Sequence, residues 1–466
     1  MTKQVTLVFT LFLSSFVANA QIIEDSLIIN YMNSNQIPGL VLGIQKGDSP
    51  ISISAYGLAD VQNSAPVENL TNFELASLSK QFTAAAILKL QEEGKLTVED
   101  ELVHHFPNAP NHWNGIKIKH LLWHTSGLPG MFPHDNFEQL SFTGYAQMEA
   151  RLMDEMMQTN LVSKEISIKS ILTDSLDFKP GTNYNYSDVG YLLLGIVIDN
   201  ITGSYHNYMT NEIFVANGLN NTYLLNQEKV VANQARGYSL KNGELINIMR
   251  TWDFEIPSYF GVFSNAEDLL KWSRILDTNN FLNDQSKSFL FSKGQLTQGA
   301  TIEYGAGWEI NQVNGLKIIS HNGVTGTRMI KIPTKNLTVV MLSNLGYNGN
   351  DMVDPWSLTN IVLPQLGVET TINKNHITSS HQKVAKFNKK AFHKIAGNYK
   401  TKEGIEARIF LKDSTPFFEG NQAINEIAFL ENGTWLVLGL TYEYVLSYNS
   451  QKQELTSNYG RVFIKE

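Results

Sequence analysis

A serine and a lysine three residues apart, Ser77 and Lys80, stand at the start of a strongly amphipathic segment of this chain. From Ser77 to Glu93 there is no proline or glycine, and apolar residues recur at helical spacing. Gly94 follows the segment, and glycine is a typical residue at the C-terminal end of a helix. We therefore predict a helix over residues 77–93. Because residues three apart on a helix share a face, the Ser77 hydroxyl and the Lys80 amine are expected to be neighbours.

A serine and a lysine in this arrangement can form a nucleophile without a histidine. The hydroxyl needs a partner that takes its proton, and lysine at its ordinary pKa of about 10.4 is already protonated at neutral pH. Burial in a cleft and the positive end of the helix dipole both disfavour the ammonium form, so we expect them to lower the pKa of Lys80. The alternative is a helix-start serine beside a solvated lysine, because a four-residue pattern also arises by chance. A second Ser-x-x-Lys, at residues 380–383, lies in a polar stretch without helical periodicity and is interpreted as chance.

Two later segments carry further polar groups on predicted loops and strand ends. Residues 179–182, Lys-Pro-Gly-Thr, are a turn signal, and they lead to Tyr186 and Asp188 ahead of an apolar run. Residues 317–320 are predicted to form a strand that leads to His321 and Gly323, and a further strand is expected to end near residue 344. A glycine at a sheet edge, such as Gly323, allows a substrate backbone to approach closely.

These segments, in this order, resemble the serine beta-lactamase and penicillin-binding-protein superfamily, and most of all its class C and D,D-peptidase-related branch. The resemblance covers roughly residues 25–365. It rests on three ordered motifs and on three connecting segments, which are Ser77-x-x-Lys80, Tyr186-Ser187-Asp188, His321-Asn322-Gly323, residues 121–129 (Leu-Leu-Trp-His-Thr-Ser-Gly-Leu-Pro), Thr202-Gly203 and residues 304–308 (Tyr-Gly-Ala-Gly-Trp). The resemblance implies an α/β (α+β) fold in which an antiparallel sheet is flanked by helices and carries a helical subdomain.

The resemblance also implies roles for individual residues. Ser77 would attack a carbonyl group to form an acyl-enzyme, and Lys80 would help to deprotonate it. Tyr186 would relay protons to the leaving group and later activate water, with a pKa that the neighbouring Lys80 is expected to depress. The backbone N–H groups of Ser77 and Val324 would form the oxyanion hole. Tyr186 as an ordinary loop tyrosine remains the alternative.

Two positions depart from the pattern of many relatives. Asp188 stands where an asparagine amide often helps to hold the acylamido side chain of the substrate, and an ionised carboxylate donates no hydrogen bond. His321 stands where penicillin-recognising enzymes usually have lysine, and a histidine with an ordinary pKa of about 6.5 is mostly neutral at pH 7. Asp188, His321, Gly323 and Val324 are thus candidate substrate-binding residues of a site that favours esters, amides or peptides over acidic beta-lactams. His321 as a packing histidine beside the sheet is the alternative.

The N-terminal residues resemble a secretory signal peptide. They contain a basic residue, Lys3, then an apolar stretch over residues 5–17 and the small-residue site Ala18-Asn19-Ala20. This pattern predicts export to the periplasm or the medium, with cleavage after Ala20. The apolar run is short for a membrane anchor, and no later stretch is long and apolar enough to span a bilayer. The chain has no cysteine, and its formal net charge of −8 disfavours nucleic-acid binding.

Composition changes near residue 370. Residues 370–390 are rich in Asn, Ser, Thr and Lys, and short apolar strands separated by Gly, Asn, Asp and Ser follow them. We predict a signal peptide at 1–20, a hydrolase domain at 21–367, a linker at 368–390 and a C-terminal domain at 391–466. The last domain resembles the lipocalin-like antiparallel β barrel found after the catalytic domain in some relatives, and its role is either binding or packing over the cleft.

The sequence thus predicts an exported serine hydrolase that transfers the acyl group of an ester, amide or peptide to water. The alternatives are a class C-type beta-lactamase and a non-catalytic cell-wall or ligand sensor that keeps the fold. The histidines lack metal-binding spacing, so neither a metal nor another cofactor is expected. The sequence leaves the substrate and the oligomeric state open.

Overall fold

The computed structural model describes residues 23–129, 158–171, 175–248, 253–346, 355–369, 385–401, 406–420, 423–430, 433–438, 444–457 and 462–466. The expected signal peptide at 1–20 and most of the expected linker at 368–390 lie outside these ranges. In the part of the chain that is described, no helix has both the length and the apolar character that crossing a bilayer requires.

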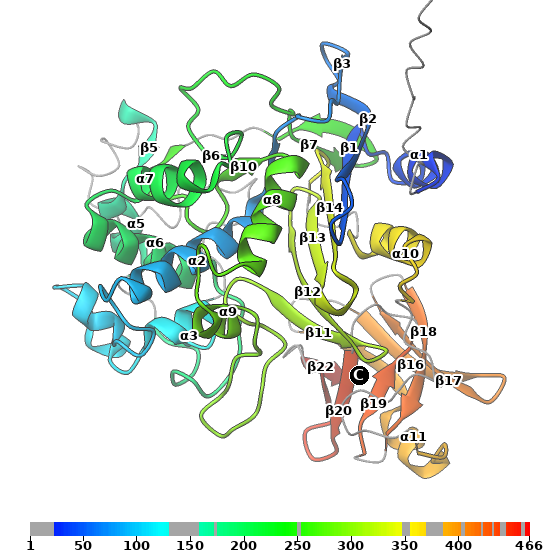
Figure 1. The fold of residues 1–466 in the computed structure, drawn as a ribbon. Coiled ribbons are helices and arrows are strands. Elements are labelled where there is room, and N and C mark those ends of the chain that lie inside the picture. The colour runs from blue at the N-terminus through cyan, green and yellow to red at the C-terminus, as the bar shows by residue number, and fades with distance from the viewer. Residues whose placement is uncertain are drawn as a thin grey trace, which may run out of the picture.

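A seven-stranded antiparallel sheet forms the centre of the larger domain, with the strand order β11-β12-β13-β14-β1-β2-β3 (Figure 1). Its strands are β1 (Gly39–Lys46), β2 (Ser52–Asp60), β3 (Ala65–Pro66), β11 (Glu309–Val313), β12 (Leu316–Gly323), β13 (Thr327–Ile332) and β14 (Leu337–Ser343). β1 pairs with β14, so that Val41 lies opposite Leu342. The sheet therefore joins segments about 300 residues apart, and the position of β12 depends on N-terminal residues.

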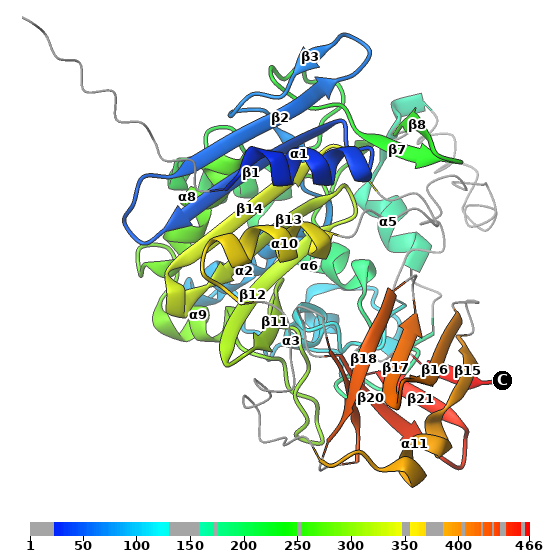
Figure 2. The same cartoon turned by 90° about the vertical axis from the view of Figure 1, so that its right-hand side faces the viewer.

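Both faces of the sheet are covered by helices. Val41 and Val340 belong to one buried cluster, whereas their neighbours Leu40 and Val339 belong to another, as the alternation of side chains along a strand requires. Helix α8 (Ala266–Asp277) packs on the first face, and α1 (Asp25–Ser34) and α10 (Pro355–Gln365) lie over the second (Figures 1 and 2).

A helical region lies on the same side of the sheet as α8 (Figure 1). Its helices are α2 (Lys80–Glu92), α3 (Ile118–Leu122), α5 (Lys164–Ile171), α6 (Asp188–Thr202) and α7 (Tyr205–Tyr208). Helix α9 (Asp284–Leu290) lies nearby. Small sheets complete the domain, formed by β4 (Phe73–Glu74), β10 (Val262–Ser264) and β6 (Tyr223–Leu224), by β5 (Leu161–Val162) and β9 (Asp253–Phe254), and by β7 (Tyr238–Lys241) and β8 (Glu244–Asn247). Helix α2 packs against α6 and is buried along almost its whole length. This burial fixes the N-terminal end of α2, where Lys80 lies.

The C-terminal residues form a closed eight-stranded barrel. Its strands are β15 (Gly397–Lys400), β16 (Glu406–Lys412), β17 (Thr415–Gly420), β18 (Ala423–Phe429), β19 (Trp435–Val437), β20 (Tyr444–Asn449), β21 (Glu454–Ser457) and β22 (Val462–Lys465). Helix α11 (Lys389–Ile395) contributes Phe392 to the barrel core, where Trp435 and Ile409 are also buried. Large side chains thus fill the core that the described barrel residues form.

The barrel is joined to the larger domain through an apolar contact. Leu436 and Leu438 belong to the same buried cluster as Leu358 of α10, whereas Trp435 and Val437 face the barrel interior. The two faces of β19 therefore pack into two different buried clusters, one inside the barrel and one shared with the larger domain. The predicted fold class is confirmed, because an antiparallel sheet flanked by helices is followed by a small antiparallel barrel.

Candidate active site

Ser77 and Lys80 lie at a joint between two kinds of helix rather than on one continuous helix. Residues Ala76–Ser79 form a 3₁₀ turn, and α2 begins at Lys80. Ala76 has φ +47°, the left-handed region that a non-glycine residue rarely adopts. The predicted end of the helix is confirmed, since α2 stops at Glu92 and Gly94 has φ +69°. Backbone N–H groups in the first turn, which include that of Ser77, have no acceptor within the helix.

Lys80 is fully buried and is surrounded by acceptors. Its Nζ donates to Ser77 Oγ at 3.1 Å and to the backbone oxygen of Tyr259 at 3.0 Å. It also lies 2.5 Å from Asp188 Oδ1. The first two contacts are hydrogen bonds, and the third is an ion pair. Lys80 is thus placed as a charged hydrogen-bond donor to the serine oxygen.

Asp188 is the first residue of α6, whose N-cap Ser187 accepts a hydrogen bond from Gly190 N. The positive end of the helix dipole favours a negative charge at this position. Its side chain is 17% exposed, whereas that of Lys80 is 0% exposed. An opposite charge this close favours the ammonium form of Lys80. The sequence expectation considered only burial and the dipole of α2, and Asp188 acts in the opposite direction.

Tyr186 lies beside the Ser77–Lys80 pair, and Lys80 Nζ is 4.8 Å from the centre of its ring. Its hydroxyl is buried and makes no hydrogen bond of normal geometry within the described residues. Burial raises the pKa of Tyr186 well above 10, the Asp188 charge adds to the rise, and the nearby Ser77 hydroxyl opposes it. The expectation that Lys80 depresses this pKa is wrong, because desolvation of the phenolate dominates. Tyr186 is therefore a neutral phenol at rest.

His321 is buried at the end of β12 and is held by two hydrogen bonds. Its Nδ1 lies 2.8 Å from the backbone oxygen of Asn322, which can only accept, so this nitrogen carries the proton. Its Nε2 then accepts from the Tyr304 hydroxyl, also at 2.8 Å. Burial, followed by the charge of Lys80, lowers the pKa of His321 to about 3. The third motif thus has no positive charge at neutral pH, as the ordinary histidine pKa already suggested.

Gly323 brings the end of β12 close to the residues that precede Ser77. A Cβ atom on Gly323 would lie only 2.2 Å from the backbone oxygen of Leu75, so a larger residue would force the two segments apart. Two hydroxyls from the same hairpin secure the contact, because Thr327 Oγ1 donates to Leu75 O at 2.9 Å and Thr325 Oγ1 donates to Glu74 O at 2.7 Å. Val324, between Gly323 and Thr325, is 44% exposed. The hairpin and the nucleophile turn are therefore held as one unit.

Three other residues of the site had no assigned role in the sequence. The rings of His124 and Tyr304 pack near Tyr186, one tilted and one edge-on, with ring centres 4.3 Å and 6.1 Å away, and Tyr259 supplies the carbonyl that binds Lys80. His124 and Tyr304 lie in segments that carry the family resemblance, which was the available signal. Lys80 contacts Tyr259 only through its backbone oxygen, which every residue type has, so the sequence could not have predicted this contact.

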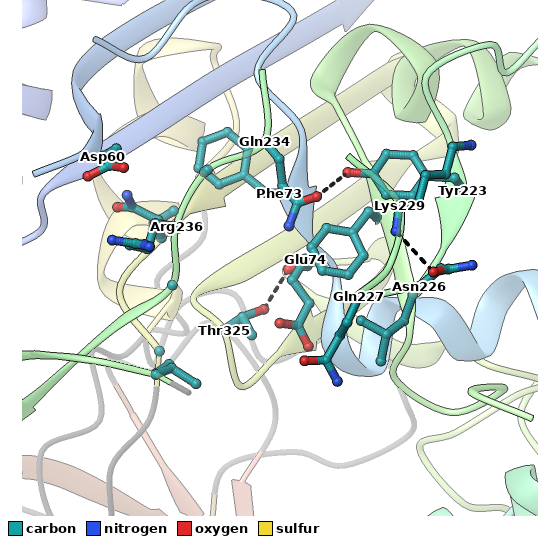
Figure 3. A pocket seen from close by; sticks show the side chains of 18 residues that line it. Asp60, Phe73, Glu74, Tyr223, Asn226, Gln227, Lys229, Gln234, Arg236 and Thr325 are labelled. Carbon is teal, nitrogen blue, oxygen red and sulfur yellow. Dashed lines mark hydrogen bonds between the residues drawn. The ribbon is translucent and has the colours of Figure 1, made fainter. Parts of the chain in front are cut away.

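A cavity of about 520 Å³ is lined by Phe73 and Glu74, which precede the 3₁₀ turn, and its lining does not include Ser77, Lys80 or Tyr186 (Figure 3). Glu74, Thr325 and Arg236 contribute to its lining, and the Thr325–Glu74 hydrogen bond lies on its wall. Its walls carry charges of both signs together with amide side chains. Among the described residues, no group of three His, Asp or Glu side chains is arranged to hold a metal ion.

Comparisons with known proteins agree with the fold and with the family resemblance. A family model described as Beta-lactamase matches residues 25–362. Penicillin-binding protein 4* of Bacillus subtilis is 30% identical over 335 residues, which are 66% of this chain and 68% of that protein. The crystal structure of a penicillin binding protein from Bacillus halodurans has a TM-score of 0.57 and 25% identity, and the match covers 70% of this chain and 97% of that one. An octameric penicillin-binding protein homologue from Pyrococcus abyssi shares the fold over 94% of this chain and 98% of its own, with a TM-score of 0.59 and 20% identity.

Proposed function

Because this chain belongs to the beta-lactamase family, we propose that it is a serine hydrolase that forms an acyl-enzyme at Ser77. The observation that carries the proposal is the 3.1 Å hydrogen bond between Ser77 Oγ and the buried Lys80 Nζ, within a site that also contains Asp188 and Tyr186. A hydrogen bond from a buried ammonium group stabilises negative charge on the serine oxygen that accepts it. A lysine in solvent would stabilise this negative charge far less, because water screens the interaction.

The proton of Ser77 passes in this proposal to the Lys80–Asp188 pair. As Oγ bonds to the substrate carbonyl carbon, its proton moves to Nζ while Nζ gives one to Asp188 Oδ1, 2.5 Å away. Lys80 stays an ammonium, and Asp188 becomes a neutral acid. The N–H groups of Ser77 and Val324 stabilise the oxyanion, and removal of one such donor costs about 2.7 to 4 kcal/mol in known enzymes.

Tyr186 acts as the general acid in this mechanism. A phenol with a raised pKa holds its proton until a strongly basic leaving group, an alkoxide or an amine, develops beside it. The leaving group departs with the Tyr186 proton, and the proton held by Asp188 restores Tyr186 through Lys80. Water then attacks the acyl-serine, and the same groups return its proton to Ser77 Oγ.

The charges of the site favour an ester, amide or peptide that has no carboxylate beside the scissile bond. The Lys80 charge is buried and paired with Asp188, and His321, with a pKa of about 3, adds no positive charge. Burying an unpaired substrate carboxylate here would cost several kcal/mol. Acidic beta-lactams are therefore poorer substrates in this proposal, although the relatives named above make them a required comparison.

Labelling with a fluorophosphonate probe tests the proposal. We expect one adduct on the wild-type protein, mapped to Ser77 by mass spectrometry, and none on Ser77→Ala. Turnover of p-nitrophenyl esters, of a peptide ending in D-Ala-D-Ala and of nitrocefin then ranks the substrate classes. Preference for nitrocefin would support the beta-lactamase alternative. Thermal stabilisation by a ligand without any adduct or turnover would support the sensor alternative and contradict the proposal.

We also propose that the protein is exported and that its signal peptide is cleaved after Ala20. The support is the composition of residues 1–20, with one basic residue, an apolar stretch and a small-residue site. N-terminal sequencing of protein secreted from a bacterial host should begin at Gln21. A protein that retains Met1 in the cytoplasm would contradict the proposal.

A further inference from the structure

His124 follows α3 and occupies a strained position. It has φ +57°, which is uncommon for a residue with a side chain, and it is only 1% exposed. Such strain persists only where the surrounding structure holds the residue firmly, and it is often found at functional sites. His124 lies in the segment 121–129, which carries part of the family resemblance and has no role in the mechanism above.

His124 accepts two hydrogen bonds, one from each residue next to Tyr186. The backbone N–H of Asn185, just before Tyr186, donates to His124 O at 3.0 Å. The backbone N–H of Ser187, just after it, donates to His124 Nδ1 at 3.0 Å. One residue therefore fixes the peptide groups on both sides of the phenol, which leaves the Tyr186 backbone little freedom.

The same loop supports the neighbouring residues. Gly181 N donates to Thr125 O at 2.7 Å, and Ser187 Oγ donates to Pro129 O at 2.7 Å. These contacts hold the loop at residues 181–187 along its length. The two hydrogen bonds that His124 accepts are thus part of a continuous support, and within it His124 is the residue that contacts both neighbours of Tyr186.

The imidazole ring of His124 also limits the movement of the phenol. Its centre lies 4.3 Å from that of Tyr186 and 4.6 Å from that of Tyr304. Since Nδ1 accepts from Ser187, the proton of the neutral ring lies on Nε2. Burial, and then the charge of Lys80, lower the pKa of His124 well below 6.5, so the ring stays neutral and Nδ1 remains an acceptor at working pH.

We propose that His124 is a positioning residue for the proposed hydrolase reaction. It holds the Tyr186 phenol in place by accepting the hydrogen bond from Ser187 N at Nδ1 and by packing its ring against the phenol. This inference rests on the proposed function. It assigns His124 no proton transfer and no contact with substrate. A displacement of about 1 Å in a catalytic group can lower a rate about 100-fold, so the loss of such a support should be measurable.

Two substitutions separate the parts of this role. His124→Asn keeps an oxygen acceptor in place of Nδ1 and tolerates a positive φ, but it removes the ring. His124→Gly accepts the positive φ and removes both the acceptor and the ring. We expect His124→Asn to lower kcat several-fold and His124→Gly to lower it about 100-fold, with KM changed little in either variant.

A double-mutant cycle with Tyr186→Phe distinguishes positioning from general structural support. The rate of acylation of Ser77 by an alkyl ester, whose alkoxide leaving group needs the Tyr186 proton, is measured for each His124 variant, once with Tyr186 intact and once combined with Tyr186→Phe. If His124 acts through the Tyr186 hydroxyl, its substitution has no further effect once that hydroxyl is absent. A purely structural role predicts the same fold-loss in both backgrounds. Circular dichroism and thermal unfolding confirm that each variant is folded.

Each outcome decides the question. Loss of the His124 effect in the Tyr186→Phe background supports the inference, whereas equal losses in both backgrounds or an unchanged kcat overturn it. If His124→Gly does not fold, the cycle with His124→Asn decides, and an unaltered kcat in that variant overturns the inference. A wild-type protein that is not acylated at Ser77 would instead contradict the proposed function, and the inference would fall with it.

Discussion

The candidate active site and the barrel core are both buried, but they bury different chemistry. Around Ser77 the protein buries Lys80, His124, His321 and Arg328. Among the described barrel residues, the buried side chains are apolar apart from small hydroxyls such as those of Thr401 and Ser457. Burying an ionisable group costs free energy unless it is paired, whereas burying an apolar group stabilises the fold.

This difference implies that the two regions respond differently to substitution and to pH. The barrel core contributes stability and no reacting groups. The site gives up some stability to hold charged and polar groups in fixed positions, and it relies on the helices and the sheet around it. Changes in the barrel should alter stability alone, and changes in the site should alter activity and its pH dependence.

The largest expected effect on stability lies in the barrel. Trp435 is 1% exposed and packs against Phe429 and Phe392, with ring centres 4.8 Å and 5.9 Å away. We expect Trp435→Ala to lower the free energy of unfolding of the barrel by about 3 to 5 kcal/mol, because it leaves a cavity. Urea denaturation measures this loss. A fall in kcat of the folded protein comparable with that of a site variant would contradict the separation of the two regions.

Acid is expected to destabilise the larger domain next. Burial lowers the pKa of five histidines there, to about 4 for His120 and about 3 for His321, and also for His105, His124 and His206. Between pH 6.5 and about 4 the unfolded chain binds more protons than the folded one, so stability falls as the pH falls through this window.

Calorimetry at pH 7, 6 and 5 checks this prediction, with a falling unfolding temperature as the expected result. His120 Nδ1 accepts a hydrogen bond from Lys117 N, and His120→Asn keeps an acceptor while it removes one titrating group. That variant should show a shallower dependence on pH. Identical unfolding temperatures at pH 7 and pH 5 in the wild-type protein would disprove the prediction.

A smaller effect is expected from removing the charge of Asp188. Asp188→Asn keeps the size and an acceptor for Lys80, but Lys80 must then lose a proton to solvent before it can accept that of Ser77. We expect kcat/KM at pH 7 to fall at least about tenfold, or about 1.4 kcal/mol, and to recover as the pH rises. A pH–rate profile measures this change.

Asp284→Asn is a matched control, because Asp284 is 83% exposed and pairs with Lys287 on α9. The control should keep the wild-type pH–rate profile. A profile of Asp188→Asn that runs parallel to that of the wild type would rule out a proton-accepting role for the Lys80–Asp188 pair.

The smallest effect is expected on the barrel surface. Arg408 and Glu419 are 3.1 Å apart, with side chains 52% and 39% exposed. A double-mutant cycle with alanine should give a coupling energy of about 0.5 kcal/mol that decreases in high salt. A coupling above about 2 kcal/mol would show that the barrel surface, too, depends on charge.

Much of the fold followed from local patterns. The predicted strand at residues 317–320 lies within β12, and the short strands expected after residue 390 are found as strands of the barrel. These strands are predictable because their alternating or continuous apolar residues indicate buried positions, and turn residues mark where one strand ends and the next begins. The 3₁₀ turn at Ser77 was not predicted, because it depends on the left-handed conformation of Ala76 and on Ser79 Oγ, which accepts a hydrogen bond from Val262 N.

The sequence by itself determined which groups the site contains, since Ser77, Lys80, Tyr186 and His321 are recognisable in order and context. Only the tertiary structure decided their protonation states. Burial keeps Tyr186 a phenol and His321 neutral, and Asp188, brought from the start of α6 to within 2.5 Å, favours a charged Lys80. The reason is physical, because charge and desolvation depend on what surrounds a group in space, and residues 77, 188 and 321 become neighbours only when the sheet and helices have packed.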